Sequence, residues 1–414
     1  MSGPLEVAVT HLPAATGIHR WLEPAVPRTL DDLALARRQG FASVRLHLAW
    51  DAFMPTDRRV DARRLQELGT VLEGARALDI GVELVLFMQS FAGCVQLPGY
   101  AVDRRRPRPG VSVLVEGIER PGGPRDPYAD PLMLEVQERW LAQLLAAFAG
   151  HPAVRSWDLG HDPASTARPR RTAQLASWCS LLADVAHRQQ EAVHLTLGAG
   201  DVLGARGVRL AAVAPHLDAV GLLLRPAELP LLPPADTGER AAFCAALALR
   251  LAQIEGRVPP LRVVTGLPVD DDPGAPPSVP PLRARPGAEP AEPVWDVIPL
   301  VPPEGRRRTE SLLARLGEVG VAAVTATSWT VGGPRTLEAR PWSTAPSHAR
   351  EGVSDPDGDL REHGEVWARW ARSEPSAAPP VPLGEFDVEQ YYANLPDSAL
   401  ELWERWRRGS AAPS

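Results

Sequence analysis

The sequence contains no lysine, so all 44 of its basic residues are arginine. Together with 51 acidic residues they give a formal net charge of −7 at pH 7. A protein that binds nucleic acid neutralises backbone phosphates with a surplus of basic side chains. We therefore expect no nucleic-acid partner, and we attribute the missing lysine to a GC-rich genome.

Cysteine is scarce as well. The three cysteines are Cys94, Cys179 and Cys244, an odd and low number that argues against a disulfide framework. Each has apolar neighbours in the sequence, which is typical of a small core residue. No group of cysteines and histidines has the spacing of metal ligands, so we expect no metal and no other cofactor.

Long apolar runs are also missing. No stretch approaches the roughly 18 consecutive apolar residues that a membrane helix needs, so no membrane contact is expected. Residues 1–10 lack the basic start and the apolar run of a signal peptide. A cytoplasmic location is the default expectation, and the oligomeric state is left open.

The chain does contain a regular alternation of short apolar runs and longer helical patterns. An apolar run such as Val82–Phe87 is typical of a strand that is buried on both sides of a parallel sheet. The predicted strands are Leu5–Val9, Ser43–Ala49, Val82–Phe87, Val154–Leu159, His194–Leu197, Asp218–Leu224, Leu261–Thr265 and Val321–Ser328.

Helical patterns separate nearly all of these strands. We expect Thr29, Asp61 and Asp130 to begin helices as N-cap residues, and Gly40 and Gly150 to end them. Further helices are predicted over Thr172–Gln189, Ala241–Ile254 and Thr309–Val319.

Eight strands that alternate with helices predict parallel pairing and right-handed crossovers. Neither a GxGxxG nor a GxxxxGK[ST] pattern is present, which removes the best support for an open nucleotide-binding sheet. The predicted fold is therefore α/β, a (β/α)8 TIM barrel with long loops on its C-terminal face and a short C-terminal helical extension.

Three stretches interrupt the alternation. Residues 97–128 and 267–308 are too long for simple turns, and both follow strands, so they are expected over the C-terminal face where barrel active sites lie. Residues 373–384 are rich in Pro and Ala and predict a linker between a barrel over 1–372 and a helical extension over 385–414. Disorder is the open alternative for the Pro-rich parts.

Three motifs resemble clan A glycoside hydrolases, particularly family 5 cellulases and mannanases. GFASVRLHLAW over 40–50 is similar to their second strand, HPAVRSWDLGHDP over 151–163 to their fourth, and Ala326–Trp329 to the eighth-strand segment whose Trp floors a sugar subsite. Tyr391 and Tyr392 lie in a tail that resembles the C-terminal extension of mannanase-like members. The resemblance follows the chain in order, and it implies the same barrel fold.

The chain departs from this family where the catalytic residues are expected. The family has an Asn-Glu pair on strand four, whose Glu is the general acid/base, and this sequence has His161 and Asp162 there. The family nucleophile is a Glu in a pattern like EFGLP at the end of strand seven, where this sequence has Val264 or Thr265. The sixth-strand segment 221–224 lacks the usual His or Tyr.

A retaining glycosidase needs two carboxyl groups about 5–5.5 Å apart, and an inverting one needs about 6.5–9.5 Å. Asp162 is a degenerate acid/base candidate, since its carboxyl is set back by one methylene. The nearest possible replacements for the nucleophile are Asp270, Asp271 and Asp272 in the following loop. A solvated acidic loop is the plainer interpretation of these three residues.

The binding half of the family site is better preserved. The resemblance implies that six side chains could contact a sugar: Arg45, His47, Trp50, Gln89, His161 and Trp329. Structural alternatives stay open, because Arg45 could pair with Asp162, His47 could fill a barrel layer and Trp157 could point outward against a helix.

Three functional hypotheses follow. The first is a pseudo-glycosidase, a barrel that binds a carbohydrate or glycoside without hydrolysing it. The second is an active O-glycosyl hydrolase on β-glycosides, mannan or glucan with a relocated carboxylate. The third is a structural or assembly protein with a plugged barrel, which a solvent-inaccessible Trp329 would favour over the first.

Overall fold

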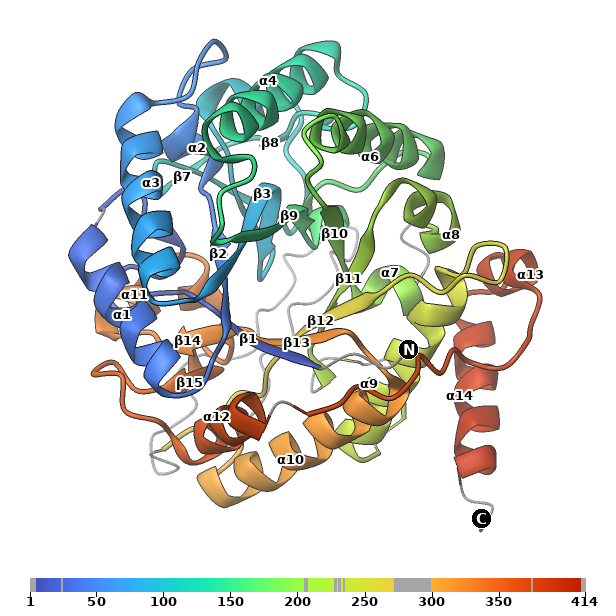
Figure 1. Ribbon diagram of the computed structural model, residues 1–414. Coiled ribbons are helices and arrows are strands. Elements are labelled where there is room, and N and C mark those ends of the chain that lie inside the picture. The colour runs from blue at the N-terminus through green and yellow to red at the C-terminus, as the bar shows by residue number, and fades with distance from the viewer. Residues whose placement is uncertain are drawn as a thin grey trace.

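Eight short parallel strands pair edge to edge until the last returns to the first (Figure 1). The computed structural model describes residues 5–23, 25–204, 208–226, 229, 232–233, 235–271, 299–373 and 375–410. The barrel strands are β1 (Glu6–Thr10), β2 (Ser43–His47), β3 (Gly81–Phe91), β9 (Val154–His161), β10 (Val193–Gly198), β11 (Ala219–Leu224), β12 (Leu261–Thr265) and β13 (Ala323–Ala326). Because β1 pairs with both β2 and β13, the barrel is closed, and the predicted (β/α)8 fold is confirmed.

Helices surround the barrel on the outside (Figure 1). The long ones are α1 (Val26–Arg38), α3 (Ala62–Ala77), α4 (Pro131–Phe148), α6 (Thr172–His187), α9 (Thr237–Leu251), α10 (Pro302–Val319) and α12 (Glu362–Ser373). Short helical turns are α2 (Trp50–Phe53), α5 (Pro163–Thr166), α7 (Ala199–Leu203), α8 (Leu210–Val213) and α11 (Pro334–Glu338). The Asp61 and Asp130 carboxylates accept backbone N–H groups of the first turns of α3 and α4, which confirms both predicted N-caps.

Three helices begin earlier than predicted. The expected N-cap at Thr29 is wrong, because α1 already starts at Val26 and the Thr29 hydroxyl donates back to the Ala25 carbonyl. Pro27 accounts for this start, since proline fits the first helical turn, where its missing N–H costs nothing. Proline also marks the start of α10, which begins at Pro302. The early start of α9 at Thr237 has another cause, because the Asp236 side chain caps that helix.

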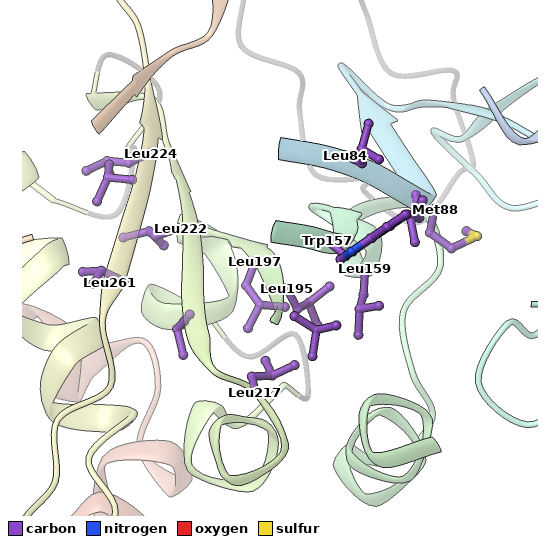
Figure 2. Packing of buried hydrophobic residues seen from close by; sticks show 14 of the residues in the cluster. Leu84, Met88, Trp157, Leu159, Leu195, Leu197, Leu217, Leu222, Leu224 and Leu261 are labelled. Atoms are coloured by element: carbon purple, nitrogen blue, oxygen red, sulfur yellow. The ribbon is translucent and has the colours of Figure 1, made fainter. Parts of the chain in front are cut away.

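Strand alternation divides side chains between two environments. Figure 2 shows Leu159, Leu195 and Leu217 in the layer between the strands and the helices. The neighbours of such residues along each strand point to the barrel interior, and there the sequence places charged groups such as Asp158 and His194. The apolar core therefore lies outside the barrel, and the barrel interior is polar.

Residues 97–128 carry strands instead of forming a plain loop. β4 (Cys94–Gln96) turns back antiparallel from the end of β3, and β6 (Ser112–Val115) and β7 (Ile118–Arg120) extend that sheet. β5 (Val102–Asp103) and β8 (Gly123–Pro124) form a second pair. Asp51 anchors this flap, since its Oδ2 accepts the Glu116 N–H at 2.7 Å and the Gln96 Nε2 at 3.2 Å.

The predicted linker lies along the N-terminal end of the barrel. The N–H of Leu5 donates to the Pro375 carbonyl at 2.6 Å, Val381 donates to Val319 at 2.8 Å, and Leu383 donates to Ala246 at 2.9 Å. These bonds fix the segment to the barrel wall along its length.

The C-terminal extension consists of α13 (Val388–Ala393) and α14 (Asp397–Ser410). Trp403 of α14 packs edge-on against Phe243 of α9 with ring centroids 5.2 Å apart, and the Tyr391 hydroxyl donates to the Val202 carbonyl. The domain boundaries at 372 and 384 remain predictions. No helix in the described ranges is long and apolar enough to cross a membrane.

Candidate functional site

A small pocket opens at the C-terminal ends of the barrel strands, as the fold predicts. It is narrow, because its cavity volume of about 10 Å³ has room for about one water molecule, far less than an ordinary ligand site. The lining residues are Thr10, Leu12, His47, Phe91, His161, Arg225, Thr327, Ser328, Trp342, His348 and Glu351. Most of them end a barrel strand or follow one directly, so strand geometry brings them together.

His161, at the end of β9, presents a hydrogen-bond donor to this pocket. Its Nδ1 lies 3.1 Å from NH1 of Arg45 and must accept, which places the proton of the neutral ring on Nε2. Burial, with the positive charge of Arg45 beside it, holds the pKa of His161 well below its ordinary value. Nε2 is buried and has no partner among the described residues, so it can donate to a ligand oxygen.

His47 is neutral for the same reasons but is already satisfied. Burial and Arg45 lower its pKa to about 3. Its Nε2 accepts from Arg45 at 3.1 Å, and its Nδ1 donates to Oε1 of Gln89, also at 3.1 Å. Gln89 in turn donates to backbone carbonyls of β3 and of Leu48, so it fixes the orientation of His47. Of these two predicted contact residues, His47 lines the pocket and Gln89 supports it.

Arg45 lies deeper and serves the barrel interior. It is 1% exposed and pairs with Glu83 on β3, with Nε 2.6 Å from Oε1, and with Asp158 on β9. Arg45 thus forms its ion pairs with these two carboxylates, one layer below the pocket, whereas the alternative drawn from the sequence was a pair with Asp162. Arg262 of β12 extends the network, with contacts of 3.0 Å to Glu83 and to Glu6.

Glu83, Asp158 and His194 have ligand atoms within 4.8 Å of one another, a spacing that suits a metal ion. Burial lowers the pKa of His194, but Glu83 and Asp158 outweigh it and raise the pKa to about 9. A protonated imidazole cannot bind a metal, and Arg45 and Arg262 already neutralise the carboxylates. The cluster is therefore a buried charge network, and a dication does not fit among its cations.

The end of strand seven carries no carboxylate. β12 directs Arg262 to the interior, so Val264, two residues on, faces the interior as well. Next comes Gly266, and a Cβ placed on it would lie 2.1 Å from Oγ1 of Thr327 and 3.3 Å from Oε2 of Glu351. A side chain at 266 is excluded because these two groups occupy its space.

Glu351 is the acidic residue that sequence reasoning missed. It precedes β15 (Gly352–Ser354), which pairs with β14 (Ser328–Thr330) after the eighth barrel strand. Its side chain is 1% exposed, and Nε of Arg225 donates to Oε1 at 3.0 Å and to Oε2 at 3.3 Å. No local pattern around Glu351 marks it, since only the fold brings it beside Gly266 and Arg225.

The other acidic candidates lie elsewhere. Asp162 does not line the pocket, and its backbone is left-handed at φ 47° and ψ 50°, where it precedes α5. Asp270 pairs with Arg350, and Asp271 pairs with Arg361 at 2.7 Å. Asp272 lies outside the described residues.

The aromatic candidates are core residues, and a different tryptophan reaches the pocket. Trp50 stacks on Trp140 at 5.8 Å beneath the helix layer, and Trp329 is 1% exposed and packs edge-on against Phe41. Trp157 points outward, where its Nε1 donates to Glu191 at 2.9 Å. Trp342, on the segment after strand eight, lines the pocket and packs edge-on against Phe91, with ring centroids 6.0 Å apart.

No family model matches the sequence, and no curated protein matches it. Solved structures do match the fold. A GH5_18 protein from Streptomyces cattleya in complex with GlcNAc has a TM-score of 0.75 at 16% identity, covering 99% of this chain and 92% of that one. A variant of the same protein in complex with Manβ1-4GlcNAc has a TM-score of 0.72 at 16% identity, covering 98% and 92%.

The exo-β-1,4-mannosidase Op5Man5 from Opitutaceae bacterium strain TAV5 has a TM-score of 0.66 at 16% identity, covering 89% of this chain and 59% of that one. The chain thus has the fold of family 5-like glycoside hydrolases, which confirms the resemblance at the level of the barrel.

Proposed function

We propose that the barrel mouth binds one sugar unit of a glycan or glycoside, and that it does not hydrolyse ordinary glycosides by the two-carboxylate route. The observation that carries this proposal is the lining of the pocket. Among the described residues that line it, Glu351 is the only carboxylate, and it is bound to Arg225. Both mechanisms of glycoside hydrolysis need a second carboxyl group across the bond to be broken.

Sugar binding is supported by the composition of the pocket, which combines apolar side chains with hydrogen-bonding groups that have no partner among the described residues. Phe91 and Trp342 offer ring surfaces for the CH groups of a pyranose, whereas His161 Nε2 and the Thr327 hydroxyl have no partner among the described residues. A buried donor without an acceptor costs about 1–3 kcal/mol, and a ligand hydroxyl would remove that cost. The pocket as it stands has room for about one water molecule, so the proposal requires the side chains at the barrel mouth to move apart when a sugar binds.

The first ligands to test are GlcNAc, mannose and Manβ1-4GlcNAc, because the similar structures hold the first and the last of these. Ligand-observed NMR and calorimetry should detect binding, and His161→Phe should weaken it about tenfold, the value of one hydrogen bond. Chromatography of Manβ1-4GlcNAc after prolonged incubation should show no hydrolysis. Turnover of this disaccharide or of mannan that Asp162→Ala abolishes would overturn the proposal.

The structural or assembly role remains a second candidate, because Trp329 is buried as that hypothesis expects. It predicts that none of the three sugars binds and that His161→Phe changes only the unfolding temperature. The same titrations therefore separate the two functions.

A further inference from the structure

We infer that Glu351 is a relocated nucleophile that takes the place of the missing strand-seven acid from the loop after strand eight. The inference rests on the proposed function, because it requires a sugar in the pocket. Its geometric basis is the proximity of Glu351 to Gly266, where Oε2 lies 3.3 Å from the position of a Cβ. The carboxylate thus reaches the end of β12 from outside that strand.

The surroundings of Glu351 suit a carboxylate that acts on a ligand. It lines the pocket together with His161 and Thr327, whose Nε2 and Oγ1 atoms are buried without a hydrogen-bond partner among the described residues. Arg225 supplies the opposite charge and fixes the carboxylate plane through contacts to both oxygens. A buried ion pair is weak as a stabilising device, because desolvation offsets most of its attraction.

This site can carry out the first step of a retaining reaction, in which a glycosyl ester forms on the nucleophile, when the leaving group needs no proton. A lone pair of Glu351 attacks the anomeric carbon, the bond to the leaving group breaks, and its electron pair departs with the leaving group. The negative charge passes from the carboxylate to the leaving group, and a glycosyl ester of Glu351 results. No proton moves in this step when the leaving group is a stable anion.

The missing half is proton transfer. No second carboxyl group lines the pocket within the part of the chain that the structure describes, and His161 is a neutral donor whose pKa is held well below its ordinary value by burial. A sugar alkoxide needs a proton to depart, whereas a dinitrophenolate or a fluoride does not. The site should therefore react with activated glycosides and leave Manβ1-4GlcNAc intact. Because no general base activates water, the ester should persist.

Dinitrophenyl β-mannoside and dinitrophenyl β-glucoside are the probes for this step. We expect a burst of about one equivalent of dinitrophenolate, and intact-protein mass spectrometry should show one added glycosyl group on the peptide that contains Glu351. Glu351→Gln should slow the burst on the order of 1,000-fold or more, because the amide is a poor nucleophile. Asp270→Asn is the matched control, since Asp270 also pairs with an arginine after strand seven but does not line the pocket.

A chemical-rescue experiment separates a nucleophile from a structural ion pair. Azide added to Glu351→Ala should restore release of dinitrophenolate and yield a glycosyl azide of inverted configuration, which a purely structural role would not produce. Sugar binding without a burst in the unsubstituted protein, or a burst that survives in Glu351→Gln, would overturn the inference and leave the proposed function standing. Absence of sugar binding would remove both.

Discussion

The guanidinium of Arg45 lies 2.6 Å from Oε1 of Glu83 in the interior of the barrel, where both side chains are buried. Asp158 binds the same guanidinium from β9, which pairs with β3 on the side away from β2. A residue that family resemblance assigns to sugar contact thus holds three strands together beneath the pocket. The layer that carries the site is built on charge pairing.

Replacement of Arg45 by methionine should destabilise the protein by about 3–5 kcal/mol, because Glu83 and Asp158 would lose a buried counter-charge. Urea unfolding followed by tryptophan fluorescence measures this change. Arg63→Ala, at an exposed pair with Glu67, is the control and should stay within about 0.5 kcal/mol. Equal effects of the two substitutions would show that the interior network contributes little.

His194 should make stability depend on pH above neutrality. Its pKa is raised from 6.5 to about 9 in the folded protein, so its contribution is complete below pH 6.5 and is lost as the pH rises through 9. The difference corresponds to on the order of 3 kcal/mol. Unfolding free energies measured from pH 6 to 10 should fall over this range, and His194→Gln should flatten that part of the curve. An unchanged slope in the variant would contradict the assignment.

Asp51 should also make stability fall as the pH rises, but over a lower range, so that its contribution is already lost at neutral pH. Burial raises its pKa from 3.8 to about 6, so its favourable contribution is present below 3.8 and is lost as the pH rises through 6. Asp51→Asn removes the buried charge but keeps an oxygen for the Glu116 N–H, and it should raise the unfolding temperature at pH 8. Asp51→Ala leaves that N–H without an acceptor and should lower stability by about 1–3 kcal/mol. Stabilisation by Asn that is as large at pH 3 as at pH 8 would be inconsistent with this account.

Of the two tryptophans after strand eight, only Trp342 should affect sugar binding. Trp342→Ala should weaken sugar binding about tenfold, because it removes an apolar wall of the pocket, and should also lower stability by about 3–5 kcal/mol, because the side chain is only 4% exposed. Trp329→Phe should leave sugar affinity unchanged and cost about 1–3 kcal/mol of stability, since Trp329 packs inside the core against Phe41. Calorimetric titration and thermal unfolding of both variants provide the two measurements, and a loss of affinity in Trp329→Phe would restore it as a sugar platform.

The barrel itself was predictable from the sequence because its strands are short, apolar and regularly separated by helices. Asp61 and Asp130 were recognisable as caps, since an aspartate before a helical pattern satisfies free N–H groups locally. Thr29 misled the prediction because Pro27 already sets the backbone for a helix start. In all three cases the side chains next to the helix start determined whether the N-cap prediction was right or wrong.

The polar interior of the barrel is visible in the sequence as charged residues within the strands, although the apolar residues around them dominate the pattern. Glu83, His194 and Arg262 each interrupt a mostly apolar strand at a position that alternation turns inward, and Asp158 occupies such a position on β9. Four such residues on different parallel strands predict a charged layer once closure of the barrel is assumed.

The pocket carboxylate could not be predicted in this way. Glu351 meets Gly266 and Arg225 only through the path of the segment after strand eight, and no sequence spacing encodes that path. Trp342 was missed for the same reason. The resemblance pointed instead to Trp329, which immediately follows the strand and is turned into the core by the short pairing of β14 with β15.

The hydrogen bond from Leu5 to Pro375 joins the first barrel strand to a segment that follows the last barrel strand. During synthesis the N–H of Leu5 therefore has no such partner until residue 375 has been added to the chain. Contacts between such distant residues form slowly, because a long loop must close first. The contacts between β1 and the segment that follows the last barrel strand should consequently be among the last to form when the barrel folds.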